Sequence, residues 1–184
     1  MIHDARLADR LGSFARTIET VIPEDELLKK LERGGPLRSK FGIDITSPTV
    51  HIGNGIPLFN LRRLQDLGHQ GVLILGDYTA TVGDPSGKDK TRPMLTPDQI
   101  ESNLETWMSQ LALILDMERL EIRRNSEWFS KMSFLDVMAL TNRMTVQQMM
   151  ERDSFENRWK KNDPISVREF VYCLMQGWDS VEVK

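Results

Sequence analysis

Apolar and polar positions follow one another along this chain in blocks that predict strands and helices in alternation. Residues 38–45 have the length of a strand, and residues 51–67 carry leucines at helical spacing. The unbroken apolar run at 71–75 is typical of a strand buried on both faces. A capping box at 96–99 predicts the start of a second helix, and residues 120–125 predict a third strand. This order predicts a parallel sheet connected by right-handed crossovers.

The segments outside this alternation have simpler patterns. Acidic residues followed by leucines predict a short helix at 23–31, ended by the glycines and proline of 34–36. Residues 78–95 predict a long polar loop. Several short helices are predicted between residues 127 and 179, and residues 182–184 predict the beginning of a fourth strand. The predicted fold class is therefore α/β: a Rossmann-like, doubly wound parallel sheet with flanking helices, incomplete on its C-terminal side.

The carboxyl ends of the predicted strands gather polar residues. In a parallel sheet these ends share one edge, and ligands bind beside that edge. The polar residues that follow the predicted strands are Asp44, Thr46, His51, Asn54, Asp77, Tyr78, Thr79 and Asn125. A binding site at this edge of the sheet is the interpretation that the pattern favours.

Composition narrows the class of protein. The 184 residues carry 24 Lys+Arg and 27 Asp+Glu, a formal net charge of −3, which disfavours binding to nucleic acid by overall charge. The apolar runs are far shorter than the roughly 20 residues of a membrane helix, and no secretory signal is visible. Cys173 is the only cysteine, which excludes an internal disulfide, and His3 and His69 lack partners at metal-ligand spacing. We therefore expect a cytoplasmic protein with no protein-bound metal and no membrane partner.

The segment His51-Ile52-Gly53-Asn54 lies where the first predicted strand gives way to a helix. A helix N-terminus favours anions because its N–H groups and its dipole face outward. Gly53 allows a ligand to approach the backbone closely, and His51 and Asn54 can donate hydrogen bonds to a phosphate. The same residues also fit a plain helix start with an exposed histidine, so the segment alone leaves both interpretations open.

Residues 83–88, Gly-Asp-Pro-Ser-Gly-Lys, form a second candidate segment. Their spacing does not match a P-loop, and the same residue types are typical of a turn without a function. However, Lys88, Lys90 and Arg92 supply cations at the predicted binding edge, where a polyphosphate would need them.

Tyr172, Gln176 and Asp179 form a third candidate. Their spacings of i, i+4 and i+7 place them on one face of the last predicted helix. A phenol, an amide and a carboxylate on one stripe suit a small ligand that has both donors and acceptors. A solvent-exposed polar face is the alternative.

In this order and spacing, the three segments resemble the tyrosyl-tRNA synthetases of the class I aminoacyl-tRNA synthetase family. The resemblance extends from about Pro23 to the last residue and rests on residues 42–54, 83–88 and 172–179. It implies an enzyme that activates L-tyrosine with ATP, accompanied by Mg2+, and then transfers the tyrosyl group to tRNA(Tyr). The tyrosine carboxylate would attack the α-phosphate directly, because it is already ionised at neutral pH.

The resemblance implies a role for each matching residue. ATP would be bound by Gly42, Asp44, Thr46, His51, Gly53 and Asn54. Tyrosine would be bound by Thr79, Asp84, Asn125, Tyr172, Gln176 and Asp179. Catalysis would rest on His51, Asn54, Lys88 and Arg92, which would stabilise charge on the phosphates, while Asp179 would accept a hydrogen bond from the substrate phenol.

The resemblance also implies how the chain is organised. Residues 1–184 would be the N-terminal part of one catalytic domain, with 1–35 as a helical extension and about 127–163 as a helical connecting region through which a homodimer forms. The mobile lysine loop of the family, KMSKS, and its anticodon-binding region have no counterpart in these residues. We therefore expect the 184 residues by themselves to be a fragment that catalyses poorly or not at all.

Departures from the family pattern keep other interpretations open. Asn54 replaces the second histidine of the HIGH signature, and Lys40-Phe41 stand where many relatives have a tyrosine that helps to hold the substrate phenol. One alternative is a catalytically silent relative that binds tyrosine or RNA. The others are a class I nucleotidyltransferase outside protein synthesis, which the stripe at 172–179 disfavours, and a tryptophan-specific relative, which Asp179 disfavours.

Overall fold

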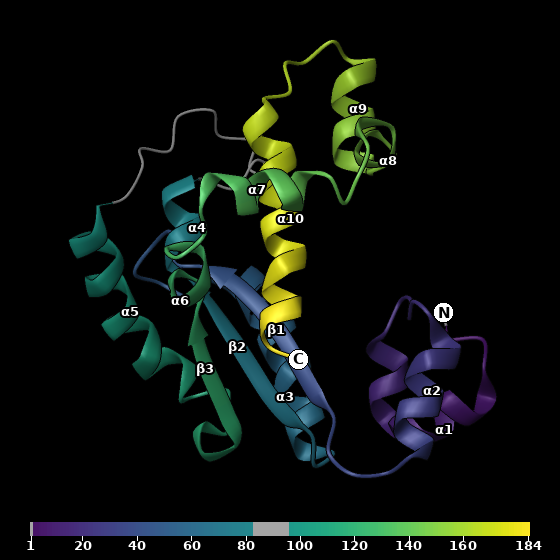
Figure 1. The fold of residues 1–184 in the computed structure, drawn as a ribbon. Helices are drawn as coiled ribbons and strands as arrows, with labels where there is room; N and C mark the ends of the chain where they lie inside the picture. Colours follow the sequence, from purple (N-terminus) through teal and green to yellow (C-terminus); the bar gives the residue numbers. More distant parts are fainter. Residues whose placement is uncertain (1, 83–95) are drawn as a thin grey trace.

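A parallel sheet of three strands forms the centre of the fold (Figure 1). The structure is a computed structural model that describes residues 2–82 and 96–184. The strands are β1 (Arg38–Asp44), β2 (Gln70–Gly76) and β3 (Leu120–Arg124), and β2 lies between the other two. The register pairs Asp44 with Gly76 and Leu75 with Arg124. The carboxyl ends of the strands therefore meet at one edge of the sheet, as the sequence predicts.

Two helices cover one face of this sheet. α3 (Ile52–Asp66) connects β1 to β2, and α5 (Pro97–Leu111) precedes β3. The apolar side chains that form the core on this face are Ile45, Leu58, Leu61, Leu73, Leu75, Ile100, Leu104, Trp107 and Leu111. The capping box predicted for α5 is confirmed, since the Thr96 hydroxyl accepts a hydrogen bond from the Gln99 N–H and the Gln99 side chain accepts one from the Thr96 N–H.

The opposite face of the sheet is covered by α10 (Val167–Glu182) and α6 (Ser126–Phe129) (Figure 1). A second core forms there, in which Val72 and Ile74 of β2 pack against Trp128, Phe129, Met175 and Val183. Helices on both faces of a parallel sheet confirm the predicted α/β, Rossmann-like arrangement.

The remaining elements form smaller clusters. α1 (Ala5–Leu11), the 3-10 helix η1 (Gly12–Thr17) and α2 (Glu24–Glu32) bury the side chains of Leu7, Leu11, Phe14 and Leu28. Between α6 and α10 the chain forms α7 (Phe134–Thr141), α8 (Val146–Met150) and α9 (Asp153–Lys160), and η2 (Met117–Arg119) is a single turn before β3. Within residues 2–82 and 96–184, no helix is long and apolar enough to cross a membrane.

Two predicted boundaries are wrong. The segment predicted as a loop from residue 78 begins within a helix, α4 (Asp77–Val82), and its residues 83–95 lie outside the described part of the chain. The carboxylate of Asp77 explains the helix, because it accepts hydrogen bonds from the Tyr78 N–H (2.8 Å) and from the N–H and hydroxyl of Ser126 (3.0 and 2.7 Å). Residues 182–184 do not begin a strand, since α10 extends to Glu182 and Val183 is buried against β2.

Candidate active site

Polar side chains lie between the carboxyl ends of the strands and α10. Lys40, Gly42 and Asp44 occupy alternate positions of β1, so they share one face of the sheet. That face is the one under α10, because the Tyr172 hydroxyl of α10 donates a hydrogen bond to Asp44 Oδ2 at 2.8 Å. Gly42 is exposed although it lies in the middle of a strand beneath a helix. The missing side chain therefore leaves the sheet open to solvent over Gly42, between Lys40 and Asp44, and we call this place the slot.

A chain of buried hydrogen bonds joins residues from β1, α4 and the end of β3. Thr79 Oγ1 donates to Asp44 Oδ1 at 2.6 Å, and Asn125 Nδ2 donates to Thr79 Oγ1 at 2.9 Å. Thr79 and Asn125 are 3 % and 1 % exposed. Because burial leaves these groups no water, their orientation is fixed by one another, and the site is held ready before any ligand arrives.

Gly76 makes this network possible, although it is not among the residues that the sequence pattern selects. A Cβ atom at this position would lie 2.0 Å from Asp44 Oδ1 and 2.5 Å from Thr79 Oγ1, distances that real atoms do not adopt. The hydrogen bond between Asp44 and Thr79 thus passes over a position that only glycine leaves free. A glycine at the end of a buried strand was the available signal.

Asp179 of α10 is a buried acid with a raised pKa. It is 5 % exposed, and its Oδ1 accepts a hydrogen bond from Trp128 Nε1 at 3.0 Å. Burial raises its pKa from 3.8 to about 6, while the hydrogen bonds from Trp128 and Asn125 and the charge of Lys40 lower it. A carboxylate in this setting favours a ligand that brings a further hydrogen-bond donor.

His51 and Asn54 form a capping box at the start of α3. His51 Nδ1 accepts hydrogen bonds from the N–H groups of Gly53 (3.1 Å) and Asn54 (3.3 Å), and Asn54 Oδ1 accepts one from the His51 N–H at 3.2 Å. With Nδ1 used as an acceptor, the neutral imidazole carries its proton on Nε2. The His51 Nε2–H and the Asn54 amide N–H groups are therefore the donors available to a ligand. The backbone N–H groups of Gly53 and Asn54, which the sequence predicts to face an anion, donate to His51 instead.

Gly53 also makes room for the capping imidazole, because a Cβ atom at this position would lie 3.0 Å from His51 Cε1.

The structure brings together most of the candidate residues that it describes. Asp44, Thr79, Asn125, Tyr172 and Asp179 lie around the slot over Gly42, and Thr46 is half-buried in the segment that follows β1. Gln176 is exposed on α10. Asp84, Lys88 and Arg92 fall within 83–95, outside the described residues. In the part of the chain that is described, no group of three potential metal ligands occurs.

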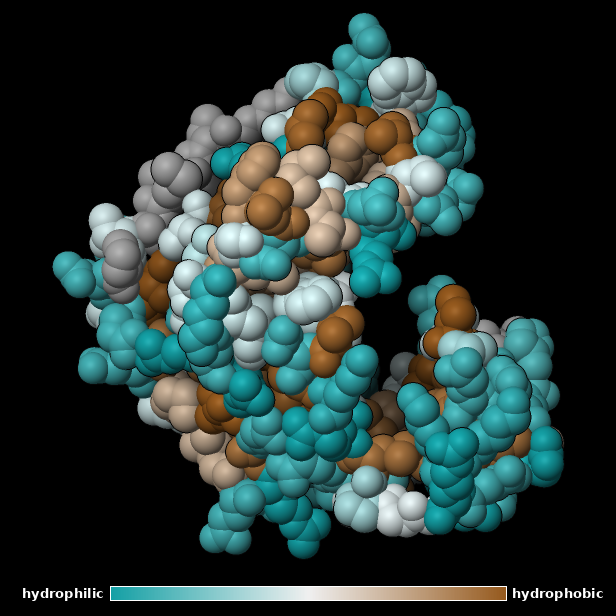
Figure 2. All heavy atoms as spheres, viewed as in Figure 1, coloured by the Kyte–Doolittle hydropathy of each residue, from teal (hydrophilic) through white to brown (hydrophobic). Residues whose placement is uncertain are grey.

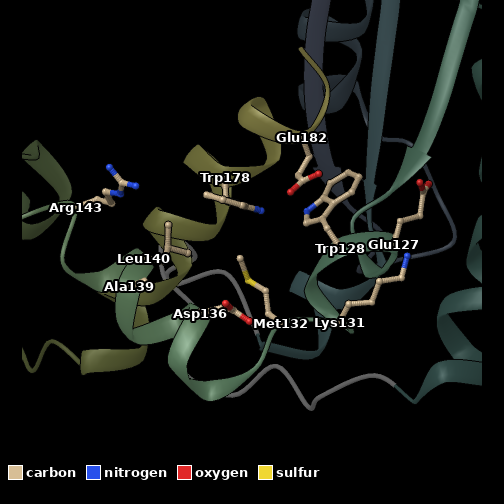
Figure 3. A pocket seen from close by; sticks show the side chains of 10 residues that line it. All are labelled: Glu127, Trp128, Lys131, Met132, Asp136, Ala139, Leu140, Arg143, Trp178 and Glu182. Carbon is tan, nitrogen blue, oxygen red and sulfur yellow. The ribbon is translucent and has the colours of Figure 1, made fainter.

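A separate cavity of about 420 Å³ lies away from this edge, between α6, α7 and α10 (Figure 3). Trp128, Met132, Leu140 and Trp178 give it an apolar lining, and charged residues surround its rim. The indole N–H of Trp178 is buried and has no hydrogen-bond partner among the described residues. None of the candidate residues around Gly42 lines this cavity, and Trp128, which donates to Asp179, forms a wall between the two.

Comparisons with known proteins relate this arrangement to others. The model of the family "tRNA synthetases class I (W and Y)" matches residues 32–184. The tyrosine–tRNA ligase of Thermotoga maritima is 46 % identical over 176 residues, which cover 96 % of this chain and 44 % of that protein. The tyrosine–tRNA ligase of Cupriavidus pinatubonensis is 49 % identical over 173 residues, covering 92 % of this chain and 42 % of that protein. The chain thus spans less than half the length of these relatives.

Solved structures agree in fold. The structure of tyrosyl-tRNA synthetase complexed with L-tyrosine from Archaeoglobus fulgidus has a TM-score of 0.72 and 24 % identity, covering 96 % of this chain and 52 % of that one. A C-terminally truncated mitochondrial tyrosyl-tRNA synthetase from Coccidioides posadasii has the same TM-score of 0.72 and covers 95 % of this chain.

Proposed function

The chain belongs to the class I tRNA synthetases for tryptophan and tyrosine, and from this premise we propose that it supplies the ATP- and tyrosine-binding edge of a tyrosine–tRNA ligase. The observation that carries the proposal is Asp179, a buried carboxylate on α10 beside an open slot in the sheet. A phenol hydroxyl in the slot would donate to this carboxylate, and a charged acceptor strengthens such a hydrogen bond. The tyrosine–tRNA ligases among its relatives support tyrosine over tryptophan.

The reaction that this proposal assigns needs no nucleophile from the protein. The substrate carboxylate attacks the α-phosphorus of ATP, pyrophosphate leaves, and the tyrosyl group of the adenylate then passes to the 3′ end of tRNA(Tyr). Mg2+ would accompany the phosphates as part of the substrate. Catalysis then consists of holding the two substrates in line and of directing donors at the phosphate charge that grows in the transition state.

The two ends of the site would divide this work. At the tyrosine end, Asp179 holds the phenol, and Tyr172 with Gln176 and Asp84 would hold the ammonium group. Asp44 links the ends, because it accepts hydrogen bonds from both Tyr172 and Thr79. At the ATP end, the slot beside Gly42 and the segment through Thr46 would receive the nucleotide, and His51, Asn54, Lys88 and Arg92 would face the phosphates.

Pyrophosphate exchange tests this function. In the protein at its gene-encoded length, we expect exchange of labelled pyrophosphate into ATP with tyrosine and none with tryptophan or phenylalanine. Exchange that depends on tryptophan would assign the chain to the other branch of the family. Tyrosine binding without any exchange would favour the catalytically silent binding module, for which Asn54 in place of a histidine is the motivating observation.

Substitutions of His51 separate its capping role from its proposed role toward ATP. His51→Ala removes both the acceptor that caps α3 and the outward Nε2–H, so it is expected to lower the free energy of unfolding by about 1 kcal/mol and to lower adenylate formation. His51→Asn keeps a good N-cap, but its amide N–H groups are on a shorter side chain and do not reach the position of Nε2–H. We expect His51→Asn to retain the stability of the parent protein in urea unfolding and to lower kcat for adenylate formation about 10- to 100-fold, as for a lost hydrogen bond to a charged group. Full activity of His51→Asn would show that Nε2–H does not contact the phosphates.

We also propose that the protein forms a homodimer through the region 127–163. Phe134, Leu135 and Trp159 are 77 %, 77 % and 70 % exposed there. Figure 2 shows hydrophobic side chains gathered over α7 and the neighbouring α8 and α9. An exposed apolar surface of this kind is typical of a protein interface.

Sedimentation velocity tests the dimer with a matched pair of variants. Leu135→Asp is expected to weaken dimerisation at least about tenfold, because it places a charge in an apolar interface. Leu113, 85 % exposed, lies between α5 and η2, so Leu113→Asp makes the same chemical change outside the proposed interface and should leave the dimer intact. Equal behaviour of the two variants would contradict this placement of the interface.

A further inference from the structure

Lys40 lies beside the slot over Gly42 and has no role in the proposed function described above. Lys40 precedes Gly42 by two residues on the same face of β1, and its side chain is half-buried. A Cβ atom built on Gly42 would lie 4.0 Å from Lys40 Nζ, so the ammonium group of Lys40 reaches to the side of the open slot. Lysine side chains on a sheet surface usually extend to water, and this one bends along the sheet instead.

Two contacts place α10 antiparallel to β1: the Tyr172 hydroxyl donates to Asp44 Oδ2 at 2.8 Å, and Arg38 Nε donates to the Val183 carbonyl at 3.3 Å. Asp179 lies between these two contacts along α10, and Lys40 lies between them along β1, so the two charges are close enough to attract each other. Burial lowers the pKa of Lys40 and the charge of Asp179 raises it, while the charge of Lys40 lowers the pKa of Asp179. The other groups around Asp179 are Trp128 of α6, Asn125 at the end of β3 and Asp44 of β1. Trp128 and Asn125 are neutral donors, and Asp44 carries a negative charge that opposes ionisation of Asp179. Among these neighbours, Lys40 is the one that brings a positive charge.

We propose that Lys40 is a positioning residue for recognition of the substrate phenol, because its ammonium group keeps Asp179 ionised at the side of the slot over Gly42. This role rests on the proposed function, and it explains how the ligase would maintain its specificity for tyrosine. An ionised Asp179 can only accept, so it binds a hydroxyl donor well and leaves an unpaired charge beside a ligand that lacks one. A protonated Asp179 would lose much of this preference, since a neutral carboxyl group is a weaker acceptor.

This role separates Lys40 from a residue that merely fills space. If the positive charge of Lys40 is what keeps Asp179 ionised, Lys40→Arg retains tight binding of tyrosine. Lys40→Met, whose side chain has a similar length but no charge, loses it. Without the cation, the pKa of Asp179 rises above about 6, because burial and Asp44 then act with less opposition. The defect of Lys40→Met is therefore expected to depend on pH, and a packing defect would not.

The test measures the KM for tyrosine by pyrophosphate exchange between pH 6 and 8.5, in the protein at its gene-encoded length. An opposite charge at close range shifts a carboxyl pKa by about one unit, so the KM of Lys40→Met is expected to be raised about threefold at pH 6.5 and to approach the parent value toward pH 8.5. Lys40→Arg should follow the parent protein at every pH, and the KM for ATP should stay unchanged in both variants.

The outcomes distinguish this proposal from the proposed function. If the parent protein shows no tyrosine-dependent exchange, the proposed function fails, and direct binding of labelled tyrosine to Lys40→Met and the parent across the same pH range then decides the role of Lys40. If the parent exchanges with tyrosine and Lys40→Met has the same KM at every pH, or one raised equally at every pH, the proposal for Lys40 is overturned alone. Should Lys40→Met fail to fold, Lys40→Gln, which is neutral and polar, carries the same comparison.

Discussion

Asp179→Asn is expected to lower kcat/KM for tyrosine about 10- to 100-fold, the factor that corresponds to losing a hydrogen bond to a charged group. Asparagine has nearly the same shape as aspartate, and its Oδ1 can still accept from Trp128 Nε1, so the pocket keeps its form. What the variant lacks is the negative charge that the phenol hydroxyl would meet. Activation of phenylalanine, which brings no hydroxyl, should fall little or rise. An unchanged preference for tyrosine over phenylalanine would remove Asp179 from the phenol site.

The same variant is expected to be more stable than the parent at neutral pH. The pKa of Asp179 in the folded protein, about 6, lies above its ordinary value of 3.8, so folding favours the protonated form. Ionisation of Asp179 therefore lowers the free energy of unfolding. This effect is absent below about pH 4, grows as the pH rises toward 6, and reaches roughly 3 kcal/mol above pH 6. Urea unfolding at pH 4 and pH 7.5 measures it: the gain in the free energy of unfolding should be present at pH 7.5 and small at pH 4. Such an exchange of stability for function is common at binding sites.

Gly76→Ala is expected to lower the free energy of unfolding by about 1–3 kcal/mol and to abolish most tyrosine binding. The added methyl group would occupy the place of the hydrogen bond between Asp44 and Thr79, and both groups would have to move. Because Thr79 also accepts from Asn125, the displacement would extend along the buried network. Urea unfolding and equilibrium dialysis with labelled tyrosine measure the two effects.

Gly177→Ala is the matched control for this substitution. Gly177 is an exposed residue of α10, and a Cβ atom there meets no other atom within 4 Å. Alanine is the better helix former by about 1 kcal/mol, so this variant should be as stable as the parent or slightly more so and should bind tyrosine normally. Equal stability of the two variants would contradict the close approach at Gly76.

The elements of the fold that depend on local pattern were predictable. The apolar run at 71–75 identifies the central strand because a strand covered on both faces has no polar side. The capping boxes at Thr96 and Ser166 mark the starts of α5 and α10 because their hydrogen bonds join residues three apart in sequence. The two wrong boundaries depend on distant partners. α4 begins where Asp77 meets Ser126, and the end of α10 is buried against β2.

The candidate site also contains residues that the sequence predicts and residues whose role depends on distant partners. The rule that ligands bind at the carboxyl edge of a parallel sheet selects Asp44, Thr79 and Asn125, and the structure joins them by hydrogen bonds. The contribution of Trp128 was not predictable, since it lies 51 residues before its partner Asp179 and is indistinguishable in sequence from a core tryptophan. Gly76 was missed, and Lys40 was noted only as a departure from the family pattern, for a related reason: the importance of each comes from a side chain on another element.

One carboxylate, that of Asp77, serves the first turns of both α4 and α6. Rotation of either helix relative to the other would break a hydrogen bond to this carboxylate. Thr79 and Asn125, which hydrogen-bond each other at 2.9 Å, are thus held by contacts that do not involve the helices between α6 and α10. Evolution can thus lengthen, shorten or replace α7, α8 and α9, and so change the assembly partners of the protein, without altering the spacing of Thr79 and Asn125 at the binding site.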